Sequence, residues 1–246
     1  MRLMKFGDLD ARVTGGTDRE GGGDGPVVVL LHGFGAPGDD LVPLWRVLAA
    51  PRGTRFVFPE APVSLGAEYA GGRAWWWVDL EGRMRRRAAG EQTDTATVPE
   101  GLAESRAKVQ GFLAAVESTL DPPPGKLVLG GFSQGAMLSL DVALHTSQPL
   151  AGLVLMSGSH IAGGEWAARF ESRRGLPVFM SHGQSDEVLP FAVSEHLKST
   201  LTAHGMPVDW VPFRGGHAIP PPVIEGVGKF LQRTLITPAT PAAPAP

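Results

Sequence analysis

Short, unbroken apolar runs recur along the chain, most of them bounded by glycine or proline. They cover residues 27–31, 55–58, 126–132, 152–156, 177–180 and 208–213. Apolar runs of this length that do not alternate with polar residues are typical of strands buried on both faces of a sheet. We therefore predict that these runs are strands of a mostly parallel sheet.

Between the predicted strands, apolar residues recur at the spacing of one helix face. Such sets lie within residues 41–48, 109–120, 137–144, 193–201 and 223–231. Strands that alternate with helices favour βαβ units and a sheet covered by helices on both faces. The pattern predicts one doubly wound α/β domain over residues 1–236.

Three segments depart from this pattern. Residues 15–25 are rich in glycine and are predicted to form a flexible turn between early strands. Residues 82–100 carry four arginines within their first six positions and are predicted to form a long surface loop. This arginine run is either a solvated surface or a site that attracts an anionic substrate or lipid headgroup. Residues 237–246 form a Pro/Ala-rich tail that is predicted to be disordered.

The composition argues against several classes of protein. Lys and Arg number 22 against 25 Asp and Glu, a formal net charge of -3, which disfavours binding along a nucleic-acid backbone. There is no cysteine, which excludes thiolate nucleophiles, disulfides and Cys-ligated metal sites. The sequence shows neither a secretory signal nor an apolar run near the roughly 18 residues that span a bilayer. We expect a cytoplasmic protein that binds no nucleic acid and has no integral membrane association.

One serine lies in a motif with a chemical meaning. Gly131-Phe132-Ser133-Gln134-Gly135 fits G-x-S-x-G and separates a predicted strand from a predicted helix. A sharp strand-to-helix turn exposes the serine hydroxyl at the carboxyl edge of the sheet, where the helix N-terminus favours negative charge. Although a serine in a glycine-rich turn can be merely structural, this context predicts Ser133 as a nucleophile. The backbone N–H of Gln134 is then one donor to an oxyanion.

A serine hydroxyl needs a base, and the chain has seven histidines. His217 follows two glycines after the last predicted strand, so we expect it to reach Ser133 at the same edge of the sheet. His160, in another loop after a strand, is the alternative base. His32 and His182 each follow a strand and are predicted to make structural hydrogen bonds to their loops. Three others are predicted to lie at the surface: His145, His196 and His204.

The base in turn needs a carboxylate to orient its ring and stabilise its cation. Asp186 lies just past the predicted strand 177–180, at the same edge of the sheet, and the adjacent Glu187 is the alternative. The order Ser133, Asp186, His217 is that of α/β-hydrolases.

A second oxyanion donor is expected from the glycine-rich segment after the strand 27–31. Its glycines let the backbone approach the serine, and the Phe34 N–H is the candidate. The alternative is a glycine-rich connection with no ligand role.

Four separated segments together resemble one known family. They are LHGFG (31–35), GFSQG (131–135), HGQSDEVLP (182–190) and RGGHAI (214–219), and they resemble the phospholipase/carboxylesterase family of α/β-hydrolases. That family includes acyl-protein thioesterases and small bacterial carboxylesterases. The resemblance extends from about residue 26 to residue 233. It implies an α/β-hydrolase without a large cap domain that cleaves carboxylic esters or thioesters with no cofactor and no metal.

By position, the resemblance assigns the nucleophile, acid and base to Ser133, Asp186 and His217, and the oxyanion hole to Phe34 and Gln134. The chain departs from the family at Phe34, where leucine is more usual, but a backbone N–H performs this role. The excursion over residues 82–100 is longer and more charged than expected, which leaves the substrate preference open.

The densest aromatic cluster of the chain is Trp75-Trp76-Trp77. The family has a similar tryptophan-containing segment beside its active site. Consecutive residues cannot all face one way, so these rings either pack a loop onto the core or leave at least one at the entrance. With Phe34 and Leu65, they are expected to form an apolar acyl pocket.

The sequence therefore predicts a carboxylesterase that acts on small esters or thioesters with short to medium acyl chains, through an acyl-enzyme. We expect a monomer or a homodimer. An acyl-protein thioesterase, a lysophospholipase and a serine peptidase of the same fold remain alternatives, as does a non-catalytic ligand-binding protein on this scaffold.

Overall fold

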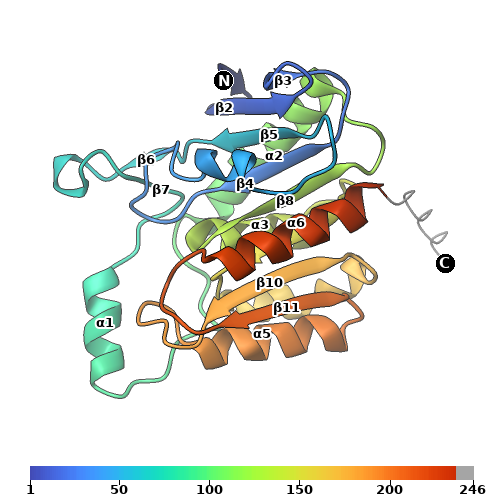
Figure 1. Ribbon diagram of the computed structural model, residues 1–246. Helices are drawn as coiled ribbons and strands as arrows, with labels where there is room; N and C mark the ends of the chain where they lie inside the picture. Colours follow the sequence, from blue (N-terminus) through green and yellow to red (C-terminus); the bar gives the residue numbers. More distant parts are fainter. Residues whose placement is uncertain (237–246) are drawn as a thin grey trace.

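The apolar runs form the centre of one long sheet in the computed structural model, which describes residues 1–236 (Figure 1). Within this part of the chain, six parallel strands lie side by side. In spatial order they are β5 (Arg55–Pro59), β4 (Val27–Leu31), β8 (Leu127–Phe132), β9 (Gly152–Met156), β10 (Val178–Gly183) and β11 (Val208–Phe213). Their carboxyl ends meet at one edge of the sheet, and the predicted mostly parallel α/β fold is confirmed. The predicted tail, 237–246, lies outside the described residues.

The sheet continues beyond β5 through an antiparallel edge. β2 (Leu9–Gly16) pairs antiparallel with both β5 and β1 (Arg2–Phe6), and β3 (Glu20–Gly22) pairs with the end of β2. The prediction of a flexible turn over 15–25 is therefore wrong in part, because this segment contains a strand. The backbone N–H of Thr17 donates a 2.9 Å hydrogen bond to the carbonyl oxygen of Gly22, and this bond closes the tight turn that lets β3 pair with β2.

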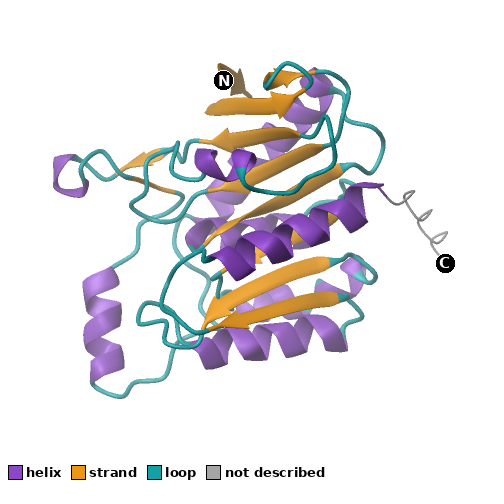
Figure 2. Cartoon of the chain, viewed as in Figure 1, coloured by secondary structure: helices purple, strands orange, loops and turns teal. Residues whose placement is uncertain are grey.

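Helices cover both faces of the sheet (Figure 2). One face packs against α2 (Leu102–Leu120), α3 (Gln134–Leu144) and α5 (Phe191–Ala203). The opposite face packs against α6 (Pro221–Ile236) and the 3₁₀ helix η1 (Val42–Arg46). Two apolar cores result, and the sheet lies between them. Two short helices follow β9, namely α4 (Gly163–Ala167) and η3 (Phe170–Arg173).

The helix predicted over 41–48 forms only the single 3₁₀ segment η1. Leu41 and Leu48 still reach the core, because they flank this segment on the side that faces the sheet. Pro51 follows closely and has no N–H to continue a helical hydrogen-bond ladder. The apolar spacing thus identified the buried face correctly but overestimated the regular structure.

Two excursions extend from the carboxyl edge of the sheet. The first is a small hairpin of β6 (Val63–Ser64) and β7 (Arg73–Ala74), with the 3₁₀ helix η2 (Ala67–Tyr69) at its tip. The second contains α1 (Leu80–Ala88), which stands away from the sheet in Figure 1. Within residues 1–236, no helix has both the length and the apolar character to cross a membrane.

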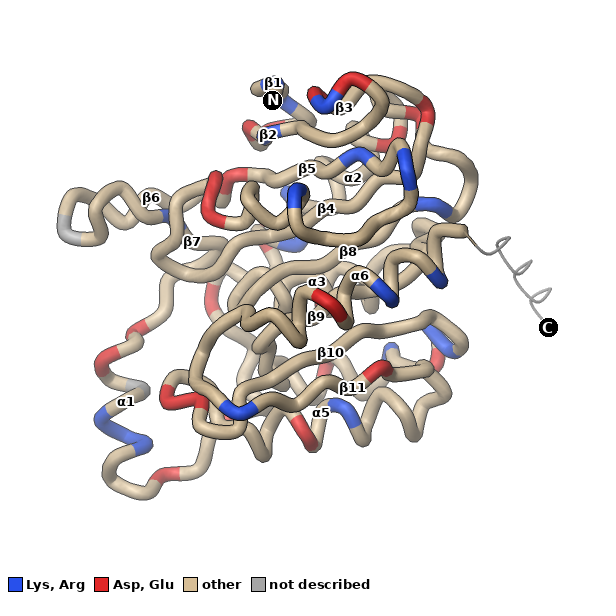
Figure 3. The backbone as a smooth tube through the Cα atoms, in the orientation of Figure 1, with Lys and Arg blue, Asp and Glu red and all other residues tan. Residues whose placement is uncertain are grey.

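The α1 helix corrects the prediction of a loop that starts at residue 82. Asp79 caps the helix N-terminus by accepting a 2.8 Å hydrogen bond from the Gly82 N–H, and arginines in its last turn complement the helix dipole. Figure 3 shows blue basic positions on α1 with red acidic positions close by. Both signals, the cap and the basic last turn, are present in the sequence.

Candidate active site

Ser133 occupies a strained turn between β8 and α3. Its backbone has φ +56° and ψ −118°, a conformation that residues with side chains rarely adopt. A Cβ atom at Gly131 or at Gly135 would collide with the carbonyl oxygen of Leu31 in the neighbouring strand β4. Glycines on both sides are therefore required for the turn, which presents the Ser133 side chain at the carboxyl edge of the sheet.

Three side chains from three loops meet at this edge. His217 Nε2 lies 2.8 Å from Ser133 Oγ, and His217 Nδ1 lies 2.7 Å from Asp186 Oδ2. Since a carboxylate oxygen can only accept, Nδ1 donates to Asp186, and the lone pair of Nε2 is then free to accept the Ser133 hydroxyl proton. The Phe132 ring packs against the imidazole with 4.8 Å between ring centroids. The structure thus brings together the three residues that the sequence singled out.

The loops that carry Asp186 and His217 are joined by main-chain hydrogen bonds. Gln184 N donates to Phe213 O, and Ser185 N donates to Gly215 O, both at 2.9 Å. A side chain at Gly183 would strike the carbonyl of Gly216, so only glycine allows this close approach. The acid and the base are therefore held in a fixed relation although they are far apart in the sequence.

Asp186 is surrounded by hydrogen-bond donors. Its Oδ1 accepts the backbone N–H groups of Val188 at 2.9 Å and Leu189 at 2.8 Å. Burial acts to raise the pKa of Asp186, but the hydrogen bond from His217 and these backbone donors together hold the pKa below its ordinary value. The alternative acid, Glu187, has an exposed side chain, and the carboxylate that is hydrogen-bonded to His217 is that of Asp186. Asp186 is the ionised partner of the imidazole.

The alternative base, His160, is directed elsewhere. Its ring stacks on Trp166 with centroids 5.5 Å apart, and neither ring nitrogen has a hydrogen-bond partner within residues 1–236. Burial, and to a lesser extent nearby His196, lower the pKa of His160, so the ring is neutral near pH 7. The prediction of a surface position fails for His145, whose side chain is only 8% exposed and lies 3.6 Å from Asp141.

His32 and His182 make the loop hydrogen bonds that were expected of them. His32 Nδ1 lies 2.8 Å from Gly33 O, and its Nε2 accepts the N–H of Ala61 at 3.1 Å. His182 Nε2 lies 3.0 Å from Leu189 O. Burial lowers the pKa of both rings.

The predicted oxyanion donors lie in two segments that meet at Ser133. A Cβ built on Gly33 would lie 3.4 Å from the Ser133 Cβ, so the loop after β4 packs directly against the serine. Within residues 1–236, the backbone N–H groups of Phe34 and Gln134 donate no hydrogen bond. The Gln134 side chain fixes this region, because its amide bonds the backbone of Trp75 at 3.0 Å and of Trp76 at 2.8 Å. Sequence reasoning missed this role of the Gln134 amide.

The residues predicted to form an acyl pocket do not all line one cavity. Leu65, Trp75 and Trp76 are buried, while Trp77 is 58% exposed and contacts the Phe34 ring with 6.0 Å between centroids. The three tryptophans line a cavity of about 440 Å³ against the start of α2. Trp75 also braces the loop after β4, since its indole N–H donates to His32 O at 2.9 Å.

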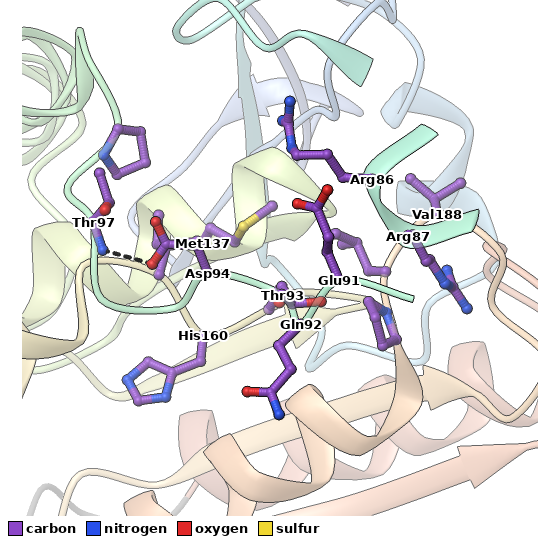
Figure 4. Close-up of a pocket in the computed structure, with 15 residues that line it drawn as sticks. Arg86, Arg87, Glu91, Gln92, Thr93, Asp94, Thr97, Met137, His160 and Val188 are labelled. Carbon is purple, nitrogen blue, oxygen red and sulfur yellow. Dashed lines mark hydrogen bonds between the residues drawn. The ribbon is translucent and has the colours of Figure 1, made fainter. Parts of the chain in front are cut away.

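A second cavity, of about 420 Å³, is lined by residues that neighbour Ser133 and Asp186 in sequence (Figure 4). Met137 lies one helical turn after Ser133, and Val188 and Leu189 are the residues whose N–H groups hold Asp186. The segment that follows α1 forms its polar wall, with Glu91, Gln92, Thr93 and Asp94. None of the five residues predicted to form the acyl pocket lines this cavity. Met137 and Val188 could have been identified from the sequence, because Met137 lies close to Ser133 and Val188 lies close to Asp186 along the chain.

The excursion is attached to the acid loop by one arginine. Arg87 donates to the main-chain carbonyls of Glu187 at 2.6 Å and of Asp186 at 3.2 Å. The polar wall of the cavity is therefore anchored to the loop that carries the carboxylate. Among residues 1–236, no group of three or more His, Asp or Glu side chains is arranged to hold a metal ion.

Comparison with known proteins places this geometry in a family. The model of the family described as Phospholipase/Carboxylesterase matches residues 20–235. Acyl-protein thioesterase 1 of Gibberella zeae is 26% identical over 217 residues, which cover 85% of this chain and 90% of that protein. Acyl-protein thioesterase 1 of Yarrowia lipolytica is 30% identical over 172 residues, which cover 67% of this chain and 70% of that protein.

Solved structures of esterases have the same fold as this chain. Esterase PE8 superposes with a TM-score of 0.77 at 29% identity, covering 93% of this chain and 99% of that one. The Bacillus cereus carboxylesterase has the same fold, with a TM-score of 0.68 at 20% identity over 92% of this chain and 94% of that one. The sequence resemblance and the α/β-hydrolase fold are thereby confirmed. This chain belongs to the phospholipase/carboxylesterase family, whose members include esterases and acyl-protein thioesterases.

Proposed function

We propose that this protein is a carboxylesterase in which Ser133 is the nucleophile, His217 the general base and acid, and Asp186 the residue that orients the imidazole. The observation that carries the proposal is the continuous chain of contacts from Ser133 Oγ to His217 to Asp186, at 2.8 Å and 2.7 Å. Both distances lie in the range that proton transfer requires.

The first half of the reaction forms an acyl-enzyme. His217 Nε2 takes the hydroxyl proton while Ser133 Oγ bonds to the ester carbonyl carbon. The negative charge that develops on the carbonyl oxygen is stabilised by the free N–H groups of Phe34 and Gln134, the latter at the N-terminus of α3. Asp186 stabilises the imidazolium. The proton then passes from His217 to the leaving alcohol, and the C–O bond to the alcohol breaks.

The second half repeats these steps with water as the nucleophile. His217 takes a proton from water, and the resulting hydroxide attacks the acyl carbon. When the tetrahedral intermediate collapses, His217 returns the proton to Ser133 Oγ and the carboxylic acid leaves. One imidazole therefore serves both half-reactions.

The 420 Å³ cavity supports short to medium acyl chains as substrates. The lining residues that neighbour the triad in sequence are apolar, namely Met137, Val188 and Leu189, whereas residues 91–94 form a polar wall. An acyl chain that extends past the apolar part would meet the polar wall, where burying a methylene chain gains little.

The alternative function is that of an acyl-protein thioesterase, the name of the relatives from Gibberella zeae and Yarrowia lipolytica. A thioester uses the same triad and the same oxyanion donors, with a thiol as the leaving group. The two functions differ in what must be accommodated outside the acyl site, which is an alcohol in one and a polypeptide in the other.

The test combines labelling and activity. A fluorophosphonate is expected to label the wild-type protein and not Ser133→Ala, which should lose about 10⁴- to 10⁶-fold in ester hydrolysis with the fold retained. Ser199→Ala, which removes an exposed hydroxyl on α5, is the matched control and should keep wild-type activity. Wild-type hydrolysis by Ser133→Ala would refute the assignment.

Substrate class is decided by a panel of aryl esters from acetate to palmitate beside an acyl-thioester and an acylated peptide. A maximum at short or medium esters supports the carboxylesterase. A clear preference for the acylated peptide supports the thioesterase. An absence of both labelling and turnover indicates a non-catalytic binding protein.

A further inference from the structure

The carboxylate of Asp186 faces two imidazoles, of which the proposed reaction uses only one. His217 Nδ1 is 2.7 Å from Oδ2, and His182 Nε2 is 3.3 Å from the same oxygen. Oδ1 is occupied by the backbone N–H groups of Val188 and Leu189. Each carboxylate oxygen thus has two nitrogen neighbours, which leaves little freedom for the carboxylate to rotate.

The surroundings of His182 fix its tautomer. Two oxygen acceptors face its Nε2, Leu189 O at 3.0 Å and Asp186 Oδ2 at 3.3 Å. Because neither oxygen can donate, the ring proton must lie on Nε2. That single N–H is shared between the carbonyl that closes the loop and the carboxylate.

Packing alone does not account for a histidine at this position. The His182 side chain is fully buried, and its Nδ1 makes no well-aligned hydrogen bond among residues 1–236, although the Gly158 backbone lies close enough to act against the lowering of the ring's pKa. A buried polar atom without a partner is unfavourable, and an apolar ring of similar size would avoid it. What the histidine supplies and an apolar residue lacks is the N–H directed at Asp186 and Leu189.

The neutrality of this donor matters for the chemistry. Burial lowers the pKa of His182, so the ring carries no charge near pH 7. A cation at this place would compensate the negative charge that Asp186 uses to stabilise the imidazolium of His217. A neutral N–H orients the carboxylate and leaves that charge available.

Other charged groups do not take over this role. The guanidinium of Arg87 reaches only the main-chain carbonyls of Asp186 and Glu187. From α5, the Phe191 ring packs against His182 with 6.1 Å between ring centroids. The carboxylate is therefore held by His217, His182 and two backbone N–H groups.

We propose that His182 is a positioning residue whose Nε2–H fixes the orientation of the Asp186 carboxylate, and through it the alignment of His217 toward Ser133. This inference rests on the proposed function, since it concerns the same triad. It adds a fourth side chain to the set of residues that determine the rate.

The test replaces His182 with two amides of different reach. The amide nitrogen of Gln reaches the place of the imidazole Nε2, whereas that of Asn reaches only the place of Nδ1. The readout is the rate at which a fluorophosphonate labels Ser133, measured across pH. In this reaction Ser133 Oγ bonds to phosphorus, fluoride leaves, and His217 takes the hydroxyl proton, so no natural substrate is needed.

We expect the fluorophosphonate to label Ser133 about 10- to 100-fold more slowly in His182→Asn, because the Asp186 carboxylate is no longer held in the orientation that aligns His217. The acid limb of its pH profile should move to higher pH, since Oδ2 loses a donor that disperses its charge. His182→Gln should restore the rate to within about threefold of wild type, with the wild-type pH profile. His182→Phe, which fills the space without a donor, should behave as His182→Asn does and replaces it if that variant fails to fold.

Three results separate the possibilities. A wild-type protein that is not labelled refutes the proposed function itself. If wild type is labelled and the Asn, Gln and Phe variants match it in rate and pH profile, the positioning role is wrong. It is also wrong if all three variants slow equally and lose thermal stability while the acid limb stays in place, because His182 is then only structural.

Discussion

Two aspartates have fully buried side chains in the described part of the protein, and their surroundings differ in one decisive respect. Asp141, on α3, is bound by the guanidinium of Arg106, with Nε 2.6 Å from Oδ2, and by the indole N–H of Trp166 at 2.8 Å. Its charge is compensated by a cation. Arg106 also bonds Glu165 at 3.0 Å, so the pair belongs to a network that joins α2, α3 and α4.

Within residues 1–236, neither Lys nor Arg contributes a donor to the Asp186 carboxylate. Its donors are the imidazoles of His217 and His182 and two backbone N–H groups. The negative charge stays available for the imidazolium that forms during the proposed reaction. Burial and hydrogen bonding alone therefore do not distinguish a structural carboxylate from a catalytic one. The distinction lies in whether the protein has already neutralised the charge.

Among the tests of this comparison between the two aspartates, the largest expected effect comes from removing the charge of Asp186. We expect Asp186→Asn to lower kcat about 10³- to 10⁴-fold, because the amide does not stabilise the imidazolium and favours the wrong tautomer of His217. The substitution is nearly isosteric, so the thermal unfolding midpoint should change little. Ester hydrolysis and a melting curve on the same sample measure both. Asp186→Asn with wild-type kcat would contradict the comparison.

Removing the cation that binds Asp141 should lower the stability of the protein and leave kcat nearly unchanged, the reverse of what is expected for Asp186→Asn. Arg106→Met leaves Asp141 buried without its main partner and should lower the free energy of unfolding by about 3 kcal/mol. The kcat per folded molecule should stay within about twofold, since this network does not contact the triad. Urea unfolding and active-site titration provide the two numbers. A large loss of kcat in folded Arg106→Met would show that the two carboxylates are coupled.

The fold could be predicted where burial leaves a clear pattern in the sequence. The parallel strands β4, β8 and β9 are apolar on both faces, so the apolar run alone gives their positions. In the first half of β2, the buried residues Leu9, Ala11 and Val13 alternate with more exposed residues. This alternation can be recognised in the sequence once the strand is known. The strand is stabilised by pairing with β5, and no local sequence pattern reveals that pairing.

The candidate site shows the same division. Ser133 and its glycines could be predicted because strain at the turn restricts which residues fit there. His217 and Asp186 followed from where loops leave parallel strands. The cavity could not be predicted, because its polar wall depends on how residues 86–97 fold back against the acid loop through Arg87. That placement is a long-range contact across about a hundred positions of sequence.

The smallest expected effect concerns how the buried rings outside the triad respond to acid. Burial lowers the pKa of His160, with a smaller contribution from His196, whereas the unfolded chain binds this proton at about pH 6.5. As pH falls below that value, the unfolded state takes up a proton that the folded state refuses. The free energy of unfolding then falls by up to about 1.4 kcal/mol per pH unit for each ring whose pKa is lowered by burial. His32 and His182 are two further rings of this kind.

His160→Phe isolates one of these contributions, because the ring stacks on Trp166 and has no hydrogen bond to lose. We expect the variant to lose stability less steeply than wild type between pH 6.5 and 5, by up to about 1.4 kcal/mol per pH unit, in urea unfolding at several pH values. Because His160 also lines the 420 Å³ cavity, the free energy of unfolding and not ester hydrolysis is the readout for this variant. Equal slopes for variant and wild type would mean that His160 is protonated in the folded state as well. Its burial beside Trp166 would then have to be compensated by a partner, as the charge of Asp141 is compensated by Arg106.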